Sequence, residues 1–250
     1  MRRFILTCNI IAPVAFIVLT FAEHFWWGLF FFFAAHALWL IATLVPNCAW
    51  FGEVIMSFKT QQKEVWLTID DGPDENETLA LLDLLDAHKA KATFFFIGTK
   101  AEKLSALVSE VRRRGCEAAN HTQHHAAGVF WSFGTQRIMQ EVRACSKILQ
   151  PFTRKKIRWF RAPAGLRNHC LHPVLEREGL RLVGWSARGY DGVRCDPAVA
   201  LARIKRHVKP GAIILIHEGR GTAVELLRAL LIWLDEEGYA CVLPDTESLR

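Results

Sequence analysis

Two long apolar runs open the chain, followed by shorter apolar runs that alternate with amphipathic segments. Residues 4–21 carry no charged side chain, and residues 25–45 carry none except the titratable His36. Each run is near the length that an α-helix needs to cross a bilayer. Only three residues separate the two runs, so the pattern predicts a hairpin of two transmembrane helices. Its expected interfacial anchors are Trp26, Trp27 and Trp39.

The first run has one alternative interpretation, a cleaved signal peptide, because Arg2 and Arg3 precede it. No clear small-x-small site ends the run, however, and a second apolar run follows at once. Arg2 and Arg3 also favour a cytoplasmic N-terminus, and Lys59 and Lys63 lie shortly after the second run. We therefore expect a multi-pass protein of the inner membrane whose C-terminal domain faces the cytoplasm; a periplasmic or extracellular domain is the alternative.

The rest of the chain alternates between strand-like and helix-like segments. Repeated βα units of this kind favour a parallel sheet, closed or nearly closed into a barrel. We expect two membrane helices within residues 1–50, a linker over 51–63 and one α/β domain over 64–250. The predicted strands are 65–70, 92–97, 117–120, 159–161, 180–185, 212–216 and 240–242, and the predicted helices are 77–88, 105–114, 136–149, 173–178, 197–206 and 223–237.

Composition narrows the remaining classes. The chain has 250 residues and 51% hydrophobic content, which allows one domain of about 200 residues plus an apolar extension. The net charge of +6 includes basic clusters at 112–114 and 154–156, but no recognition module accompanies them, so nucleic-acid binding is not indicated. The seven cysteines are scattered and form no CxxC pair, which fits a reducing compartment better than an oxidising one.

Two adjacent carboxylates, Asp70 and Asp71, follow the first predicted strand and precede a Gly-Pro turn. Taken alone, such a pair is also typical of a solvated turn. If both face one small volume, they repel each other and lose solvation, a cost that a bound cation or proton offsets. Further along, His121 and His125 have the i, i+4 spacing that would bring two imidazoles onto one helical face. One carboxylate, two imidazoles and a water form the arrangement of a catalytic zinc.

Five motifs occur in an order and rough spacing that resemble one known family. They are TIDDGP at 68–73, HTQHH at 121–125, RAPAG at 161–165, WSARGYD at 185–191 and LIH at 215–217. The pattern is similar to that of the polysaccharide deacetylases, also called the NodB-homology family or carbohydrate esterase family 4 (CE4). The similarity covers about residues 64–243. It implies a distorted (β/α) barrel with fewer than eight regular strands and a metal-dependent hydrolase acting on non-peptide carbon–nitrogen bonds.

The resemblance assigns the central roles of amide hydrolysis. By similarity to the family motifs, Asp71, His121 and His125 would ligate a divalent metal, Asp70 would be the general base and His217 the general acid. The two imidazoles favour Zn²⁺, while Co²⁺, Ni²⁺ or Fe²⁺ would accept the same ligands. Many relatives act on cell-wall or extracellular glycans, which favours the periplasmic or extracellular alternative for the domain.

The resemblance also assigns supporting roles. Arg161 would hold the carboxylate of Asp70, and Asp191 would pair with His217 and raise its pKa. The backbone N–H of Ala164 would help to bind the oxyanion. Leu215 would line the pocket for the acyl group.

Three further histidines are expected to lie outside the ligand set. His124 points away from a ligand pair spaced at 121 and 125, and we expect it to support the site from behind or to be exposed. His169 and His172 are expected to be loop residues.

Departures from the family pattern bear on the substrate. Ala164 stands where relatives usually carry Tyr, and the fourth motif, which begins at Trp185, lacks the usual final Trp and contains Arg188. These changes open the groove and add a cation, which favours an anionic or lipid-phosphate substrate over a neutral chitin chain.

The predicted function is that of a membrane-anchored hydrolase that removes an N-acyl (acetyl) group from an amino sugar. The expected partners are a glycan or lipid-linked saccharide and the lipid bilayer. The alternatives are a deformylase or deacylase of another lipid-linked amide and a non-enzymatic membrane scaffold.

Overall fold

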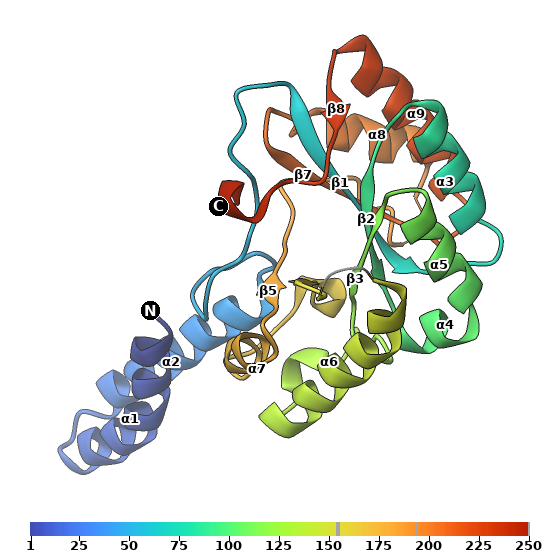
Figure 1. Cartoon of the computed structure of the whole chain (residues 1–250). Helices are drawn as coiled ribbons and strands as arrows, with labels where there is room; N and C mark the ends of the chain where they lie inside the picture. The colour runs from blue at the N-terminus through green and yellow to red at the C-terminus, as the bar shows by residue number, and fades with distance from the viewer. Residues whose placement is uncertain (154–155, 194, 250) are drawn as a thin grey trace.

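The computed structural model describes residues 1–153, 156–193 and 195–249. Two helices, α1 (Arg2–Phe21) and α2 (Phe25–Leu44), lie side by side and project from a domain formed by the rest of the chain (Figure 1). Both are long and apolar enough to cross a membrane, and only 11% and 22% of their apolar windows are buried. Neither is therefore a core helix of the domain. Asn9 joins the pair, because its Nδ2 donates to the carbonyl oxygen of Ala35 at 3.0 Å.

The domain is built on one curled sheet of parallel strands (Figure 1). Their spatial order is β5-β4-β3-β2-β1-β7-β6, and β8 pairs with β1. This arrangement confirms the predicted distorted (β/α) barrel. The strands are β1 (Glu64–Gly72), β2 (Ala92–Phe96), β3 (Glu117–Asn120), β4 (Trp159–Phe160), β5 (Arg181–Leu182), β6 (Ala187–Arg188), β7 (Ala212–His217) and β8 (Ala240–Cys241).

Helices follow most strands and cover the outside of the sheet. The α-helices are α3 (Thr78–Ala87), α4 (Gly98–Lys103), α5 (Ser105–Arg113), α6 (Thr135–Leu149), α7 (Leu171–Glu178), α8 (Pro197–Lys205) and α9 (Ala223–Glu236). The short 3₁₀ helices are η1 (Phe130–Ser132), η2 (Gln150–Phe152), η3 (Pro163–Gly165) and η4 (Thr246–Ser248). Sequence periodicity missed α4 and β6, because six and two residues are too few to show a period.

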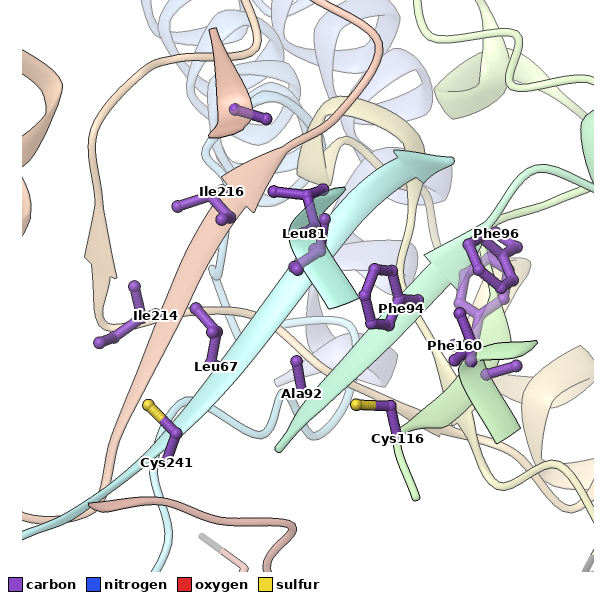
Figure 2. Packing of buried hydrophobic residues seen from close by; sticks show 14 of the residues in the cluster. Leu67, Leu81, Ala92, Phe94, Phe96, Cys116, Phe160, Ile214, Ile216 and Cys241 are labelled. Carbon is purple, nitrogen blue, oxygen red and sulfur yellow. The ribbon is translucent and has the colours of Figure 1, made fainter. Parts of the chain in front are cut away.

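Alternation along the strands separates the two sides of the sheet. Leu67 of β1, Phe94 of β2 and Ile214 of β7 lie on neighbouring strands in the large core cluster that the helices complete (Figure 2). The intervening residues point inward, where Trp66 and Trp159 belong to a second buried cluster. These two indole rings pack edge to face with centroids 5.4 Å apart. Aromatic side chains therefore fill part of the barrel interior.

Residues 51–63, expected to connect the hairpin to the domain, pack along the barrel. Ile55 forms a bridge with Val183, and Ser57 forms one with Ala212 of β7. Ile55 is fully buried in the inner cluster. The segment therefore supplies backbone and side-chain contacts beside the edge formed by β5, where regular strand pairing ends.

Candidate active site

The functional residues predicted from the sequence meet at the carboxyl ends of the strands. Because successive side chains of a strand point to opposite faces, Asp70 shares the inward face of β1 with Trp66 and Thr68. The same alternation directs His217 inward at the end of β7. Nine of the eleven predicted site residues line one open cavity of about 320 Å³, and Arg161 and Asp191 stand behind its wall.

The three predicted metal ligands, Asp71, His121 and His125, converge on one point. Nε2 of His125 and Nε2 of His121 lie 3.1 Å and 3.5 Å from Oδ1 of Asp71. That oxygen is buried and has no hydrogen-bond donor among the residues that the structure describes. The three ligand atoms lie within 4.8 Å of one another. A buried carboxylate oxygen faced by two imidazole nitrogens fits a divalent cation, because the ion would accept a lone pair from each of these three atoms.

The protonation of these groups also suits a cation. Nδ1 of His121 lies 2.9 Å from the carbonyl oxygen of Arg161, so Nδ1 carries the proton and Nε2 is left with a lone pair. Burial, together with the charge of His121, lowers the pKa of His125 to about 4. Burial alone would raise the pKa of Asp71, but the interactions with His121 and His125 outweigh it and lower that pKa. At neutral pH the site therefore offers an ionised Asp71 carboxylate and a neutral His125 imidazole.

The expectation that His121 and His125 share a helical face is wrong. Both lie in the loop between β3 and η1, and His125 has a positive φ of 50°. Thr122, with a φ of 68°, turns the loop, and its Oγ1 accepts the N–H of His125 at 3.0 Å. The side chain of Asn120 anchors this turn by accepting the N–H of Thr122 at 2.9 Å. A folded loop therefore brings the two imidazole rings together, with their centroids 4.7 Å apart.

Arg161 holds Asp70 in the floor of the cavity. Its Nη1 donates to Oδ1 of Asp70 at 2.7 Å and to Oγ1 of Thr68 at 2.9 Å, and its Nε and Nη2 donate to the carbonyls of Val183 and Gly184. Burial lowers the pKa of Arg161, whereas the charge of Asp70 raises it. Both residues are at least 97% buried. The guanidinium therefore keeps the Asp70 carboxylate oriented and charge-balanced.

His217 faces the cavity with Asp191 behind it. Nδ1 of His217 lies 3.3 Å from Oδ1 of Asp191, and Oδ2 of Asp191 accepts the backbone N–H of His217 at 2.6 Å. Burial lowers the pKa of His217, but Asp191 outweighs this effect and raises it above the ordinary value. A Cβ on Gly192 would lie 3.0 Å from Nε2 of His217. The ring of His217 therefore leaves little room for a side chain at position 192.

The remaining predicted residues shape the wall. Ala164 is exposed and has a φ of 53°, in the short helix η3 that borders the cavity. Gly165 follows it, and a Cβ there would lie 2.5 Å from the ring of Trp185. Arg188 stacks 4.9 Å from the ring of Trp185 and 3.9 Å from that of Tyr190. The cation predicted in the fourth motif therefore lies against aromatic faces at the cavity.

The inner wall of the cavity is apolar at Leu215. This side chain is 2% exposed and follows the inward alternation of β7. Leu215 therefore gives an apolar surface to the cavity that the candidate metal ligands also line.

Arg220 is a site residue that the sequence did not reveal. It lines the cavity from the loop after β7, and its Nη2 lies 3.2 Å from Oδ2 of Asp71. Glu77 holds this loop by accepting backbone N–H groups from Gly219 and Arg220. No motif marks Arg220; its only signal is a position three residues after His217.

Two other buried acids near the site were also not predicted. Glu218 is fully buried, accepts the hydroxyl of Thr78 at 2.5 Å, and burial raises its pKa to about 8. Glu141 lies 2.9 Å from Nδ1 of His124, which places that histidine outside the triad, as expected.

Comparison with known proteins decides the family. The sequence model described as polysaccharide deacetylase matches residues 58–183. The chain belongs to the polysaccharide deacetylase family. A peptidoglycan-N-acetylglucosamine deacetylase of Bacillus cereus is 29% identical over 196 residues, which cover 76% of this chain and 91% of that protein. A chitooligosaccharide deacetylase of Sinorhizobium fredii is 31% identical, covering 64% of this chain and 74% of that protein.

Solved structures of the polysaccharide deacetylase family share the same architecture. A peptidoglycan N-acetylglucosamine deacetylase superposes with a TM-score of 0.69 at 26% identity, covering 75% of this chain and 88% of the other. A mutant of a CE4 family pseudoenzyme with restored enzymatic activity has the same TM-score at 27% identity, covering 76% and 68% of the two chains. The fold therefore occurs with and without activity, and the site residues must carry the functional argument.

Proposed function

We propose that this chain is a metal-dependent hydrolase that removes an N-acetyl group from an amino sugar. The observation that carries the proposal is the buried Oδ1 of Asp71, which faces Nε2 of both His121 and His125 without a donor among the described residues. The base Asp70 and the acid His217 flank this point in the same open cavity. Such a convergence serves hydrolysis and has no evident use in a purely structural domain.

The three ligands suit Zn²⁺, with Co²⁺, Ni²⁺ or Fe²⁺ as alternatives. When bound, the ion would lower the pKa of a water molecule and polarise the acyl oxygen. The protein completes the outer part of the site, since Arg220 contacts the second oxygen of Asp71 and the Arg161 carbonyl orients His121.

The chain's own groups move the protons. Asp70, held in place by Arg161, takes a proton from the attacking water. His217, kept protonated by Asp191, gives a proton to the departing amine. An amide needs both, because its carbonyl is a weak electrophile and its amine a poor leaving group.

The pocket wall binds the reacting acyl group. The backbone N–H of Ala164 would donate to the developing oxyanion, and Leu215 would contact the methyl group of the acetyl. These roles are transferred from the family motifs and are supported by the position of both residues at the cavity.

The substrate is an N-acetylated amino sugar that carries an anionic or lipid-phosphate group. Support for the sugar comes from the relatives, which are named for N-acetylglucosamine and chitooligosaccharides. Support for the anionic group comes from Arg188, which lines the cavity, and from the small side chain of Ala164 in the wall of the same cavity.

The protein is anchored in the inner membrane by residues 1–50, and residues 51–63 connect this anchor to the catalytic domain. That domain, residues 64–250, faces the cytoplasm. The exposed apolar surfaces of α1 and α2 support this anchoring. All seven cysteines are free, which agrees with a reducing compartment. The cluster at 154–156 could assist membrane contact, although residues 154 and 155 lie outside the described ranges. Protease accessibility of the C-terminus in sealed vesicles tests the side of the membrane.

The decisive experiment measures metal content and acetate release by the full chain purified in detergent. Asp70→Asn should reduce acetate release by about 10²–10⁴-fold, because it removes the general base. Glu102→Gln is the matched control, a carboxylate-to-amide change at an exposed position of α4. Equal acetate release by wild type and Asp70→Asn, or wild type without bound divalent metal, would contradict the proposal.

Three alternatives give different results in the same assay. A deformylase would release formate, and a phosphoesterase would release phosphate. A non-enzymatic scaffold would release none of these; the likeness to a pseudoenzyme makes this outcome worth testing. The complete residue set argues against it, since Asp70, Asp71, His121, His125, Arg161, Asp191 and His217 are all present.

A further inference from the structure

Four basic side chains gather where the hairpin joins the barrel, and we call them the junction cluster. Arg2 begins α1, Arg167 and His169 lie in the loop before α7, and His172 lies in the first turn of α7. His172 is therefore helical, contrary to the expectation of a loop. In each side chain one nitrogen is buried and has no hydrogen-bond partner within the described part of the chain: Nε of Arg2 and Arg167, Nδ1 of His169 and Nε2 of His172.

The surrounding contacts place Arg167 at the end of the hairpin. Its backbone N–H donates to the carbonyl of Thr43, near the end of α2, at 3.3 Å. Its Nη2 donates to the carbonyl of Cys48, and its Nη1 donates to the carbonyl of Gly165 at 2.9 Å. Arg167 is 1% exposed, so these carbonyls supply its polar contacts in place of water.

The two histidines border the same junction. A Cβ on Gly52 would lie 2.4 Å from Cγ of His172, so this ring packs directly on the connecting segment. The ring of His169 lies 6.1 Å from that of Phe51. Ile5, in the first turn of α1, packs with Phe51 in one buried cluster, so the start of α1 lies near these rings. The charge of Arg2 acts on both imidazoles.

The junction cluster has positive charge without a counter-ion. Across residues 1–153, 156–193 and 195–249, no carboxylate forms a salt bridge with any of its four members. Burial and nearby guanidinium charge lower the pKa of His172 to about 4 and also lower that of His169, so both imidazoles are neutral at pH 7. Two guanidinium charges and two imidazole N–H donors remain. A buried cation without an anionic partner is costly, so an anion with several oxygens would stabilise the cluster.

The depth of the cluster identifies the anion. Arg2 stands where the apolar α1 begins, and Thr43 stands where the apolar α2 ends. In a membrane these points lie at the boundary of the hydrocarbon core, where lipid phosphates are found. The N-terminus of α7 adds a positive dipole, and its first turn has no acidic residue.

We propose that the junction cluster binds the phosphate of an anionic phospholipid from the bilayer that holds α1 and α2. The proposal rests on the proposed membrane anchoring but not on the chemistry of the cavity. Because Arg167 also donates to Gly165, next to Ala164, the bound lipid would steady the loop that borders the acyl pocket.

The test uses the full chain in maltoside detergent, which carries no phosphate. Phosphatidylglycerol, diacylglycerol and inorganic phosphate are added separately, and bound molecules are counted by native mass spectrometry. We expect retention of phosphatidylglycerol but not of diacylglycerol. His169→Phe/His172→Phe puts a flat phenyl ring at each position and removes the imidazole N–H donors. It should therefore weaken phosphatidylglycerol binding about tenfold or more. Arg2→Gln, at the partly exposed edge of the cluster, should also weaken phosphatidylglycerol binding. This variant replaces the double variant as the test if the double variant fails to fold.

Lys103→Gln/Arg112→Gln is the charge control, because both residues are exposed on α4 and α5, outside the cluster. It should bind phosphatidylglycerol like wild type. Equal weakening in the control, unchanged binding in the histidine and Arg2 variants, or equally tight binding of diacylglycerol would overturn the proposal. Retention of inorganic phosphate as tight as that of phosphatidylglycerol would show an adventitious ion only.

Two parallel measurements separate this proposal from the proposed function. Loss of acetate release in every preparation, with phosphatidylglycerol still bound, would remove the deacetylase assignment and leave the lipid site standing. Recovery of the chain in the soluble fraction of lysed cells, without detergent, would remove the membrane basis of the lipid site while leaving the cavity chemistry intact.

Discussion

The Asp70–Arg161 pair provides a sharp test of the site, because both groups are buried and each neutralises the other. Arg161→Met leaves the Asp70 carboxylate in the barrel without its cation and leaves Thr68 Oγ1 and two carbonyls without a donor. Breaking a buried ion pair on one side costs about 3–5 kcal/mol. That loss is a large part of the roughly 5–15 kcal/mol that stabilises a domain.

A double-mutant cycle separates the interaction energy of the Asp70–Arg161 pair from the loss of packing. Asp70→Asn alone leaves the guanidinium uncompensated and should also destabilise strongly. Asp70→Asn/Arg161→Met removes both charges, so it should be more stable than the sum of the single changes by about 2 kcal/mol. Urea denaturation of the full chain in detergent, followed by circular dichroism, gives the three free energies of unfolding. Additive single effects would refute the conclusion that Arg161 acts by balancing Asp70.

Four further predictions concern the cavity. Asp71→Asn should abolish stoichiometric zinc binding, measured by elemental analysis, because it removes the only carboxylate of the described triad. Arg220→Gln should weaken metal affinity about 10–100-fold in chelator competition, whereas unchanged affinity would exclude a role through Asp71. Asp191→Asn should lower the pKa of His217, so the alkaline loss of kcat should begin at lower pH; an unmoved profile would argue against His217 as the acid. Gly192→Ala should reduce kcat with metal content unchanged, because its Cβ would crowd Nε2 of His217.

Local sequence patterns determined much of the fold. The apolar runs predicted α1 and α2, and the alternation of βα units predicted the parallel barrel. The inward position of Asp70 also follows from local information, because it keeps the alternation of Trp66 and Thr68. These features depend on residues close together in the chain, so periodicity can reveal them.

The residue types of the triad could also be predicted from the sequence, but the backbone conformation that brings them together could not. The spacing of His121 and His125 suggested a helix, whereas Thr122 and the side chain of Asn120 fold the segment into a loop. Asn120 is itself held by α6, through the carbonyl of Val142. A contact between distant segments therefore decided the ligand geometry.

The sequence by itself determined the two apolar helices, most strands and helices of the domain, the inward residues of β1 and the types of chemical group available to the site. Only the tertiary structure decided that Arg220 reaches Asp71 and that the start of α1 packs on Phe51, near His169. The reason is that hydrophobic periodicity depends on which side of a helix or strand is buried. This pattern is set by residues close together in the chain. The placement of a loop depends on contacts from remote segments, such as the bonds from Glu77 to the Arg220 loop, which leave no period in the sequence.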